Sequence, residues 1–164
     1  MELLSPIPDN LSELLVTIVR FTELRRDVLY ENIHNTRTAG YTPRDMPVLE
    51  FVQVLNTAIA EHVQRQRLLF CDTENIKFGK RTVMKITPVP DVSARALLQK
   101  SRDEYVESQV GKLLENSLNR KVAKELLRLR RGAPCGLASL PADKMVTSDP
   151  VEDSATYGDA QDQP

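Results

Sequence analysis

The sequence predicts a mainly α-helical protein, in which long amphipathic helices near the two ends of the chain pair as a coiled-coil-like helical domain. Three observations lead to this fold class. Apolar residues recur at helical spacing along three stretches, the last of which is the longest. Aromatic residues make up only 5% of the 164 residues and Trp is absent, a thin supply for a compact globular core. The middle of the chain holds only a short segment that is irregular or β-prone.

The first helix is expected over about residues 10–34. Two prolines precede it, and Asp9, Asn10 or Ser12 can cap its N-terminus. Charged side chains fall largely between the apolar positions, as in an amphipathic helix. The apolar positions are Leu11, Leu14, Leu15, Ile18, Phe21, Leu24, Val28 and Leu29.

A loop with a distinctive composition, NIHNTRTAGYTPRD, follows from residue 32 to 45. Gly40 suits a tight reversal because it adopts positive φ without a steric penalty, and Pro43 prevents the helix from continuing. Asp45 is expected to cap a second helix over about 46–67, with Pro47 near its first position. The apolar stripe of that helix is Val48, Phe51, Val52, Leu55, Ile59 and Val63.

Residues 71–91 are expected to be irregular or β-prone, because a β-favouring run from Thr82 to Thr87 follows a turn at Gly79. One hairpin, or an ordered arm with a single short strand, fits the pattern equally well.

The third helix is predicted as one continuous element over about 93–131, capped by Ser93. It spans roughly 55–60 Å at 1.5 Å per residue. Because it is longer than the first helix, an antiparallel pair of the two leaves part of its apolar face uncovered and in need of a partner. That face is Leu97, Val106, Val110, Leu113, Leu114, Leu118, Val122, Leu126 and Leu129.

The pattern divides the chain into a helical domain, residues 1–131, and an acidic tail, residues 132–164, that is expected to be disordered. The tail holds six acidic side chains against the single basic residue Lys144, and few large apolar residues.

Composition excludes several classes of protein. The net charge of −1 gives no reason to expect binding to nucleic acid or membrane, and no apolar run is long enough to span a bilayer. The N-terminus lacks a secretory signal, so the chain is expected in the cytoplasm unless another export route takes it. Two Cys and two His without ligand spacing indicate neither a disulfide framework nor zinc.

Two clusters are weighed as sites and set aside. Cys71, His34 and Asp45 could in principle form a nucleophilic centre, but no local motif fixes their geometry, so we expect no enzyme, cofactor or metal. A basic run near the end of the third helix suits a solvated helix end or a partner surface better than nucleic acid, because no aromatic residue is interleaved with it. The run is Arg120, Lys121, Lys124, Arg128, Arg130 and Arg131.

A family resemblance rests on two motifs. The first is a helix that ends in N-I-x-N and is followed by T-x-G-Y and an Arg-Asp pair. Its matching residues are Val28, Leu29, Glu31, Asn32, Ile33, Asn35, Thr38, Gly40, Tyr41, Arg44 and Asp45. The second is the core Glu115, Asn116, Ser117 and Leu118, preceded by Leu114, in a Leu-rich closing helix.

Together these motifs resemble the bacterial flagellar rod, hook and hook-filament junction proteins, and especially the small proximal-rod members of that family. The resemblance covers residues 10–131 and is strongest over 24–45 and 105–130. The chain departs from the pattern at Tyr30 and His34, where small residues are usual, and at Ala39, where Pro is usual.

The resemblance implies a structural subunit of the flagellar basal-body rod, which polymerises through its terminal helices into the drive-shaft tube. It implies self-association, contacts with other rod and basal-body proteins, and passage through the flagellar type III export apparatus without a cleaved signal. The location implied is the rod, where it crosses the periplasm. Subunit contacts would involve Asn32, Ile33, Asn35, Gly40, Tyr41, Arg44, Asp45, Leu114, Asn116 and Leu118. The alternative is a cytoplasmic helical adaptor or export chaperone that binds partner helices.

Overall fold

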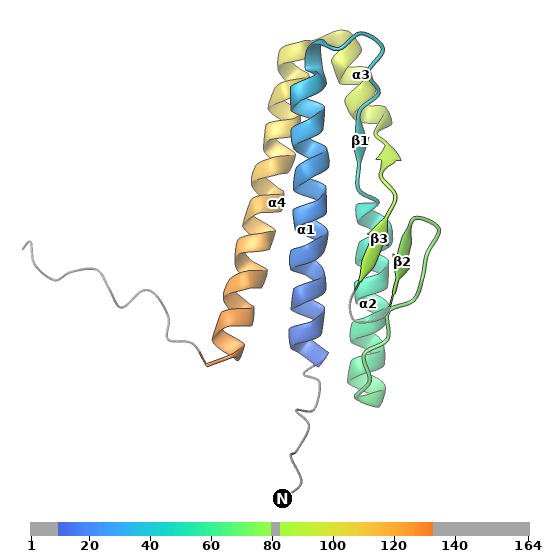
Figure 1. The fold of residues 1–164 in the computed structure, drawn as a ribbon, viewed down its shortest axis with the longest axis vertical. Coiled ribbons are helices and arrows are strands. Elements are labelled where there is room, and N and C mark those ends of the chain that lie inside the picture. The colour runs from blue at the N-terminus through green and yellow to red at the C-terminus, as the bar shows by residue number, and fades with distance from the viewer. Residues whose placement is uncertain (1–9, 80–82, 133–164) are drawn as a thin grey trace, which may run out of the picture. The chain divides into compact units, whose positions relative to one another are not determined.

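The computed structural model describes residues 10–79 and 83–132, and the predicted tail beyond Gly132 lies outside this part of the chain. The described residues are mainly helical, which confirms the predicted fold class (Figure 1). The helices are α1 (Asn10–His34), α2 (Val48–Arg65), α3 (Val92–Lys100) and α4 (Arg102–Arg130), with a 3-10 turn η1 (Asn35–Arg37). The short strands are β1 (Arg44–Asp45), β2 (Ile76–Phe78), β3 (Met84–Ile86) and β4 (Val89–Pro90).

Helices α1 and α4 lie side by side and antiparallel (Figure 1), which confirms the predicted pairing of the first helix with the last. Hydrogen bonds fix the direction, because Asn32 near the end of α1 meets Gln109 near the start of α4, whereas Thr22 meets Asn116 further along. The buried positions of α4 are Tyr105, Gln109, Asn116 and Ala123. Polar and small side chains, rather than leucines, therefore make up the α4 side of this interface.

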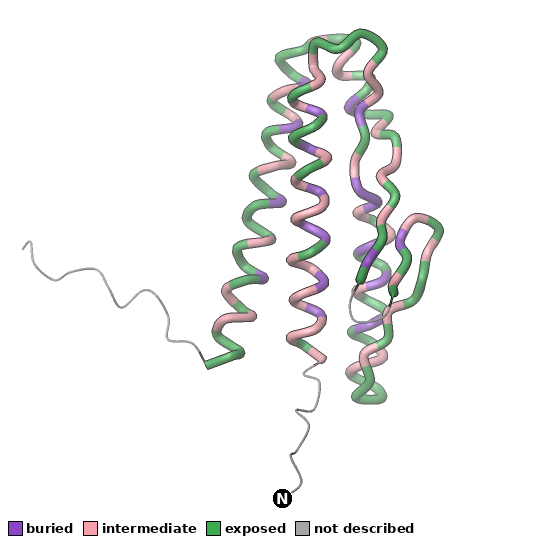
Figure 2. The backbone as a smooth tube through the Cα atoms, in the orientation of Figure 1, coloured by how far each residue is buried: buried purple, intermediate pink, exposed green. Residues whose placement is uncertain are grey.

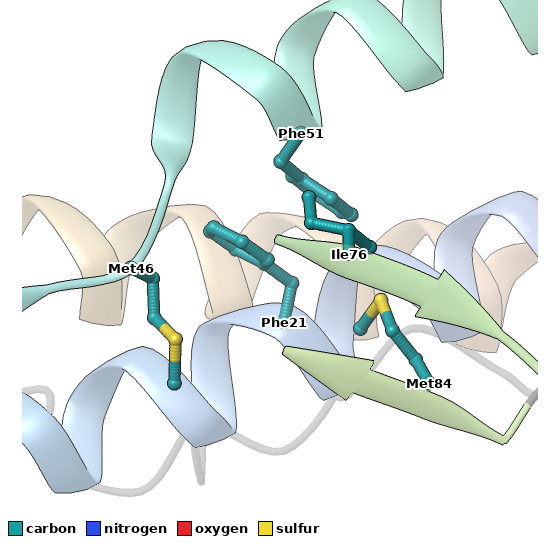
Figure 3. Packing of buried hydrophobic residues seen from close by; sticks show 5 residues of the cluster. All are labelled: Phe21, Met46, Phe51, Ile76 and Met84. Carbon is teal, nitrogen blue, oxygen red and sulfur yellow. The ribbon is translucent and has the colours of Figure 1, made fainter. Parts of the chain in front are cut away.

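A second layer covers α1 with α2 and a β-hairpin. Phe21 of α1 stacks on Phe51 of α2, with ring centroids 3.8 Å apart and ring planes 5° from parallel. Met46, Ile76 and Met84 close around the two rings and complete the buried apolar cluster (Figure 3). Burial of this cluster is the main apolar attachment of the middle segment to α1.

The middle segment forms two antiparallel strand pairs. Strands β2 and β3 make a hairpin in which Ile76 pairs with Ile86 and Phe78 with Met84, so the hairpin alternative is the correct one. Strands β1 and β4 pair Asp45 with Val89, which joins the loop after α1 to the segment before α3.

The prediction of one helix over 93–131 is wrong, because the chain leaves helical geometry at Ser101. This residue is extended, with φ −152° and ψ 119°, and its side chain accepts a hydrogen bond from the Glu104 backbone N–H. A Ser followed three residues later by Glu is the capping-box pattern that starts a new helix. Helix α3 is likewise capped by Asp91, whose carboxylate accepts from the Ala94 N–H, and not by the predicted Ser93.

The predicted cap of the second helix is also wrong. Helix α2 begins at Val48 after Pro47, which makes no side-chain cap, and it ends at Arg65 before the left-handed Gln66 (φ 53°). The Asp45 side chain is bonded elsewhere, because it lies at the contact between α1 and α4.

Candidate functional site

The side chain of Asn32 anchors the loop that follows α1. Its Oδ1 accepts hydrogen bonds from the Arg44 backbone N–H at 3.1 Å and from the Tyr41 hydroxyl at 2.9 Å. Its Nδ2 donates to the Arg44 carbonyl at 2.7 Å and to Gln109 Oε1 at 2.8 Å. Asn32 is 0% exposed, and its bond to Gln109 is buried, whereas its bonds to Tyr41 and Arg44 are partly buried. The amide therefore acts as a bridge between α1, β1 and α4.

Helix α4 contributes two buried residues to the same anchor. The Tyr105 hydroxyl donates to the Asn32 carbonyl at 3.1 Å, and burial raises the pKa of Tyr105 to about 12. Gln109 Oε1 accepts a hydrogen bond from the Asn32 amide. Gln109 Nε2 is buried and has no hydrogen-bond partner among the described residues. The end of α1 and the start of α4 are thus held together by polar bonds that depend on exact side-chain geometry.

The loop itself reverses as the sequence predicts. Gly40 adopts φ +74°, a conformation that glycine tolerates and side-chain-bearing residues rarely do. Asn35 donates to the Glu31 carbonyl at 2.9 Å and accepts from the Thr38 hydroxyl, so its bonds stay within the local turn. Ile33 is partly buried. The two Asn residues of the motif therefore differ: Asn32 makes long-range contacts and Asn35 makes local ones.

A second polar cluster surrounds Asp45. Its carboxylate accepts from Arg25 Nε at 2.9 Å and Nη2 at 3.0 Å, and from Lys112 Nζ at 3.2 Å. Lys112 also pairs with Asp91, the cap of α3. Burial disfavours the Asp45 charge, but the bonds and charges of Arg25 and Lys112 outweigh it, so the pKa of Asp45 lies below its ordinary value. This cluster joins α1, β1, α3 and α4.

The apolar stripe of α4 is largely exposed, and part of it borders a groove that α1 and α2 also line. Six side chains of this stripe are exposed by 40% to 66%, and we call them the leucine face. Few positions along α4 are buried (Figure 2). The face consists of Val110 40%, Leu114 66%, Leu118 62%, Val122 50%, Leu126 49% and Leu129 49%. Asn116, between Leu114 and Leu118, points inward and donates to the Thr22 carbonyl at 2.7 Å. Part of this stripe is uncovered, as expected, but the cause is the orientation of the stripe on α4 rather than a greater length of the helix.

An apolar groove runs over α1 between α2 and α4. Ile18 and Phe21 of α1 line it, with Val52 and Leu55 on the α2 side and Leu118 and Val122 on the α4 side, around a volume of about 460 Å³. Helix α2 also exposes Val52, Ile59 and Val63. Leu118 and Val122 belong to both the groove and the leucine face, so that face and the α2 side of the groove are neighbouring apolar surfaces carried by different helices.

The contacts of Asp45 and of the basic run on α4 differ from those of a nucleophilic centre or a nucleic-acid site. The Asp45 carboxylate is bonded to Arg25 and Lys112 rather than to a nucleophile, and Cys71 is a free, exposed thiol. Within the basic run, Lys124 pairs with Glu23 of α1 at 3.1 Å and Arg128 with Glu125 at 2.7 Å. Over the described ranges there is neither a group of residues suited to a metal ion nor a helix apolar enough to cross a membrane.

Four residues of the Asn32 and Asp45 clusters do not stand out as site residues in the sequence: Arg25, Tyr105, Gln109 and Lys112. A detectable signal existed, because Gln109, Asn116 and Ala123 recur every seven residues on one face of the last helix. The stripe beside it is more apolar and gives the stronger helical signal.

Comparison with protein families, curated proteins and solved structures found no match to this chain. The resemblance to flagellar axial proteins therefore rests on the two motifs alone.

Proposed function

We propose that this chain is a self-assembling structural subunit of the bacterial flagellar basal-body rod, of the proximal-rod FlgB type. The observation that carries the proposal is the leucine face of α4. Six large aliphatic side chains along one helix remain 40% to 66% exposed, although the same helix is firmly held to α1. A contiguous apolar surface of this kind marks a place where another protein binds.

The side chains that are buried between α4 and α1 are not those of the leucine face. Helix α4 is attached to α1 through Tyr105, Gln109, Asn116 and Ala123, and none of the six side chains of the face is buried. Association gains roughly 25 cal/mol for each Å² of apolar area that it removes from water. The face is therefore available for contacts between subunits at little cost to the folded monomer.

Two different apolar surfaces on one subunit support a tube rather than a closed dimer. The leucine face of one copy can pack against Val52, Ile59 and Val63 of α2 in the next copy. Head-to-tail contacts between unlike surfaces do not close on themselves and generate helical assemblies. This is the geometry that a rod requires.

The resemblance of the loop after α1 supports the flagellar assignment within this class of assemblies. The motif residues Asn32, Tyr41 and Asp45 hold that loop in one conformation, and they leave Arg44 exposed beside them. A fixed loop at the end of the helix pair presents the same surface on each subunit. The proposal includes contacts with other rod proteins, export through the flagellar type III apparatus, and a location in the rod across the periplasm. It involves no catalysis, cofactor or nucleic acid.

Cell fractionation tests this function. The full-length chain, tagged at a position that leaves swimming intact, should co-purify with basal bodies, and a deletion strain should lack rods and fail to swim. A soluble pool that excludes basal bodies, together with normal rods in the deletion strain, would contradict the proposal. That result would favour the helical adaptor or export chaperone, for which the leucine face would bind a partner helix.

A further inference from the structure

A basic pocket lies where the loop after α1 meets the junction of α3 and α4. We call it the tip pocket; it has a volume of about 520 Å³. Residues 36–42 line one side, and residues of α3 and the start of α4 line the other. Four basic side chains, Arg37, Arg95, Lys100 and Arg102, are among its lining residues, and no acidic residue is.

Basic side chains dominate the lining of the tip pocket, although Arg37 and Arg102 also line a neighbouring cavity that contains Asp103 and Glu107. Lys100 pairs with Glu104 at 3.2 Å, and both side chains are well exposed. Arg37, Arg95 and Arg102 are exposed, and within the described ranges no carboxylate pairs with any of them. Guanidinium groups bind carboxylates through two parallel hydrogen bonds, so three of them around one cavity suit several carboxylates spaced along a chain.

The chain itself carries such a ligand in its C-terminal segment. After Lys144 the sequence holds the five acids Asp149, Glu152, Asp153, Asp159 and Asp162 and no basic residue. Helix α4 starts at the tip pocket and carries the chain away from it over 29 residues, about 43 Å at 1.5 Å per residue (Figure 1). Gly132, where the described part of the chain ends, therefore lies at the opposite end of the helix pair from the pocket.

We propose that the tip pocket binds the acidic segment, residues 149–164, of a second copy of this chain. Copies lined up end to end bring the C-terminal end of one α4 toward the tip pocket of the next, which matches the acidic segment to the basic cavity. This inference rests on the proposed self-assembly and adds an axial contact to it. The attraction is electrostatic and the arginines of the pocket are exposed, so it weakens as salt shortens the screening length below about 10 Å.

Isotope-mixed cross-linking tests the inference on the full-length protein. Equal amounts of ¹⁴N and ¹⁵N chains are assembled, then treated with a carbodiimide that joins Lys amines to carboxylates. The expected product joins Lys100 of one isotope to an acid in residues 149–164 of the other. The Lys100–Glu104 link within one chain is the internal positive control. Links from Lys100 to the segment within a single isotope only, or none at all, would overturn the inference.

A charge-reversal pair separates the tip pocket from general basic attraction. Arg37→Glu with Arg95→Glu should reduce the mixed-isotope product at least about fivefold, because both cations lie in the pocket. Lys121→Glu reverses an exposed cation of α4 outside the pocket and should leave the yield unchanged. Equal losses in both variants, or no loss in the pocket variant, would contradict the inference.

The two proposals fail in different ways. If copies assemble and no mixed-isotope product forms, only the tip-pocket contact is wrong. If the wild-type chain stays monomeric at every concentration, both are wrong.

Discussion

Asn32 and Gln109 lie 77 residues apart in the sequence, and their side-chain amides meet at 2.8 Å inside the contact between α1 and α4. Both residues are 0% exposed. Buried amides of this kind contribute specificity, because only one relative position of the two helices satisfies them. The polar contact fixes the helix pair and leaves the leucine face of α4 exposed.

Replacing Asn32 by Ala should destabilise the fold by about 3 kcal/mol. The substitution leaves the Arg44 backbone groups and Gln109 Oε1 without a partner in a buried site, and each such group costs about 1–3 kcal/mol. Urea unfolding followed by circular dichroism measures the loss.

The matched control for this prediction is Asn35→Ala in the same motif. Its bonds are local and its surroundings more exposed, so we expect a loss of about 0.5–1 kcal/mol. Equal losses for the two variants would show that Asn32 is not the anchor of the loop.

Replacing Asp45 by Asn should cost about 3 kcal/mol at neutral pH, because it leaves the buried Arg25 without its counter-charge. The pKa of Asp45 is lowered in the folded state, so the contribution of its charge is complete above the unfolded value near 3.8. That contribution is lost as pH falls through the lower, folded pKa. The gap in unfolding free energy between wild type and variant should therefore narrow below pH 3.8, and a gap that stays constant there would refute this role.

Replacing Ser101 by Ala should cost about 1 kcal/mol, because it removes the side chain that caps α4. Ser117→Ala is the control, since Ser117 lies exposed within α4 and Ala has the higher helix propensity. Thermal unfolding should show a lower midpoint for the first variant and an unchanged or slightly higher one for the second. A similar response of both would mean that the cap at Ser101 contributes nothing.

The parts of the fold that depend on local chemistry could be predicted from the sequence. The apolar periodicity predicts a helix over about residues 10–34, which are the observed bounds of α1. Gly40 indicates the chain reversal that follows this helix. The antiparallel pairing of the first and last helices followed from their positions and patterns. The first two features depend on neighbouring residues, which a single sequence displays directly, whereas the pairing was inferred from the apolar patterns of two distant helices.

The parts that depend on distant residues could not be predicted in the same way. Asp45 is well placed to cap a helix, yet Arg25 and Lys112 hold it in an ion-pair cluster that only the tertiary fold creates. The sequence also does not indicate which side of α4 contacts α1, because the leucines of α4 outnumber its buried polar residues. The break at Ser101 is different, because its Ser-x-x-Glu pattern is local and can be recognised in the sequence.

The most direct test of the central claim is sedimentation velocity of the purified full-length chain over a range of concentrations. Wild type should form assemblies that keep growing with concentration. Leu118→Glu, in the middle of the leucine face, should remain monomeric with unchanged helix content and thermal midpoint. Val92→Glu, at an exposed aliphatic residue outside the face, should assemble like wild type. A wild-type chain that stays monomeric throughout, or a Leu118→Glu chain that assembles as wild type does, would contradict the account.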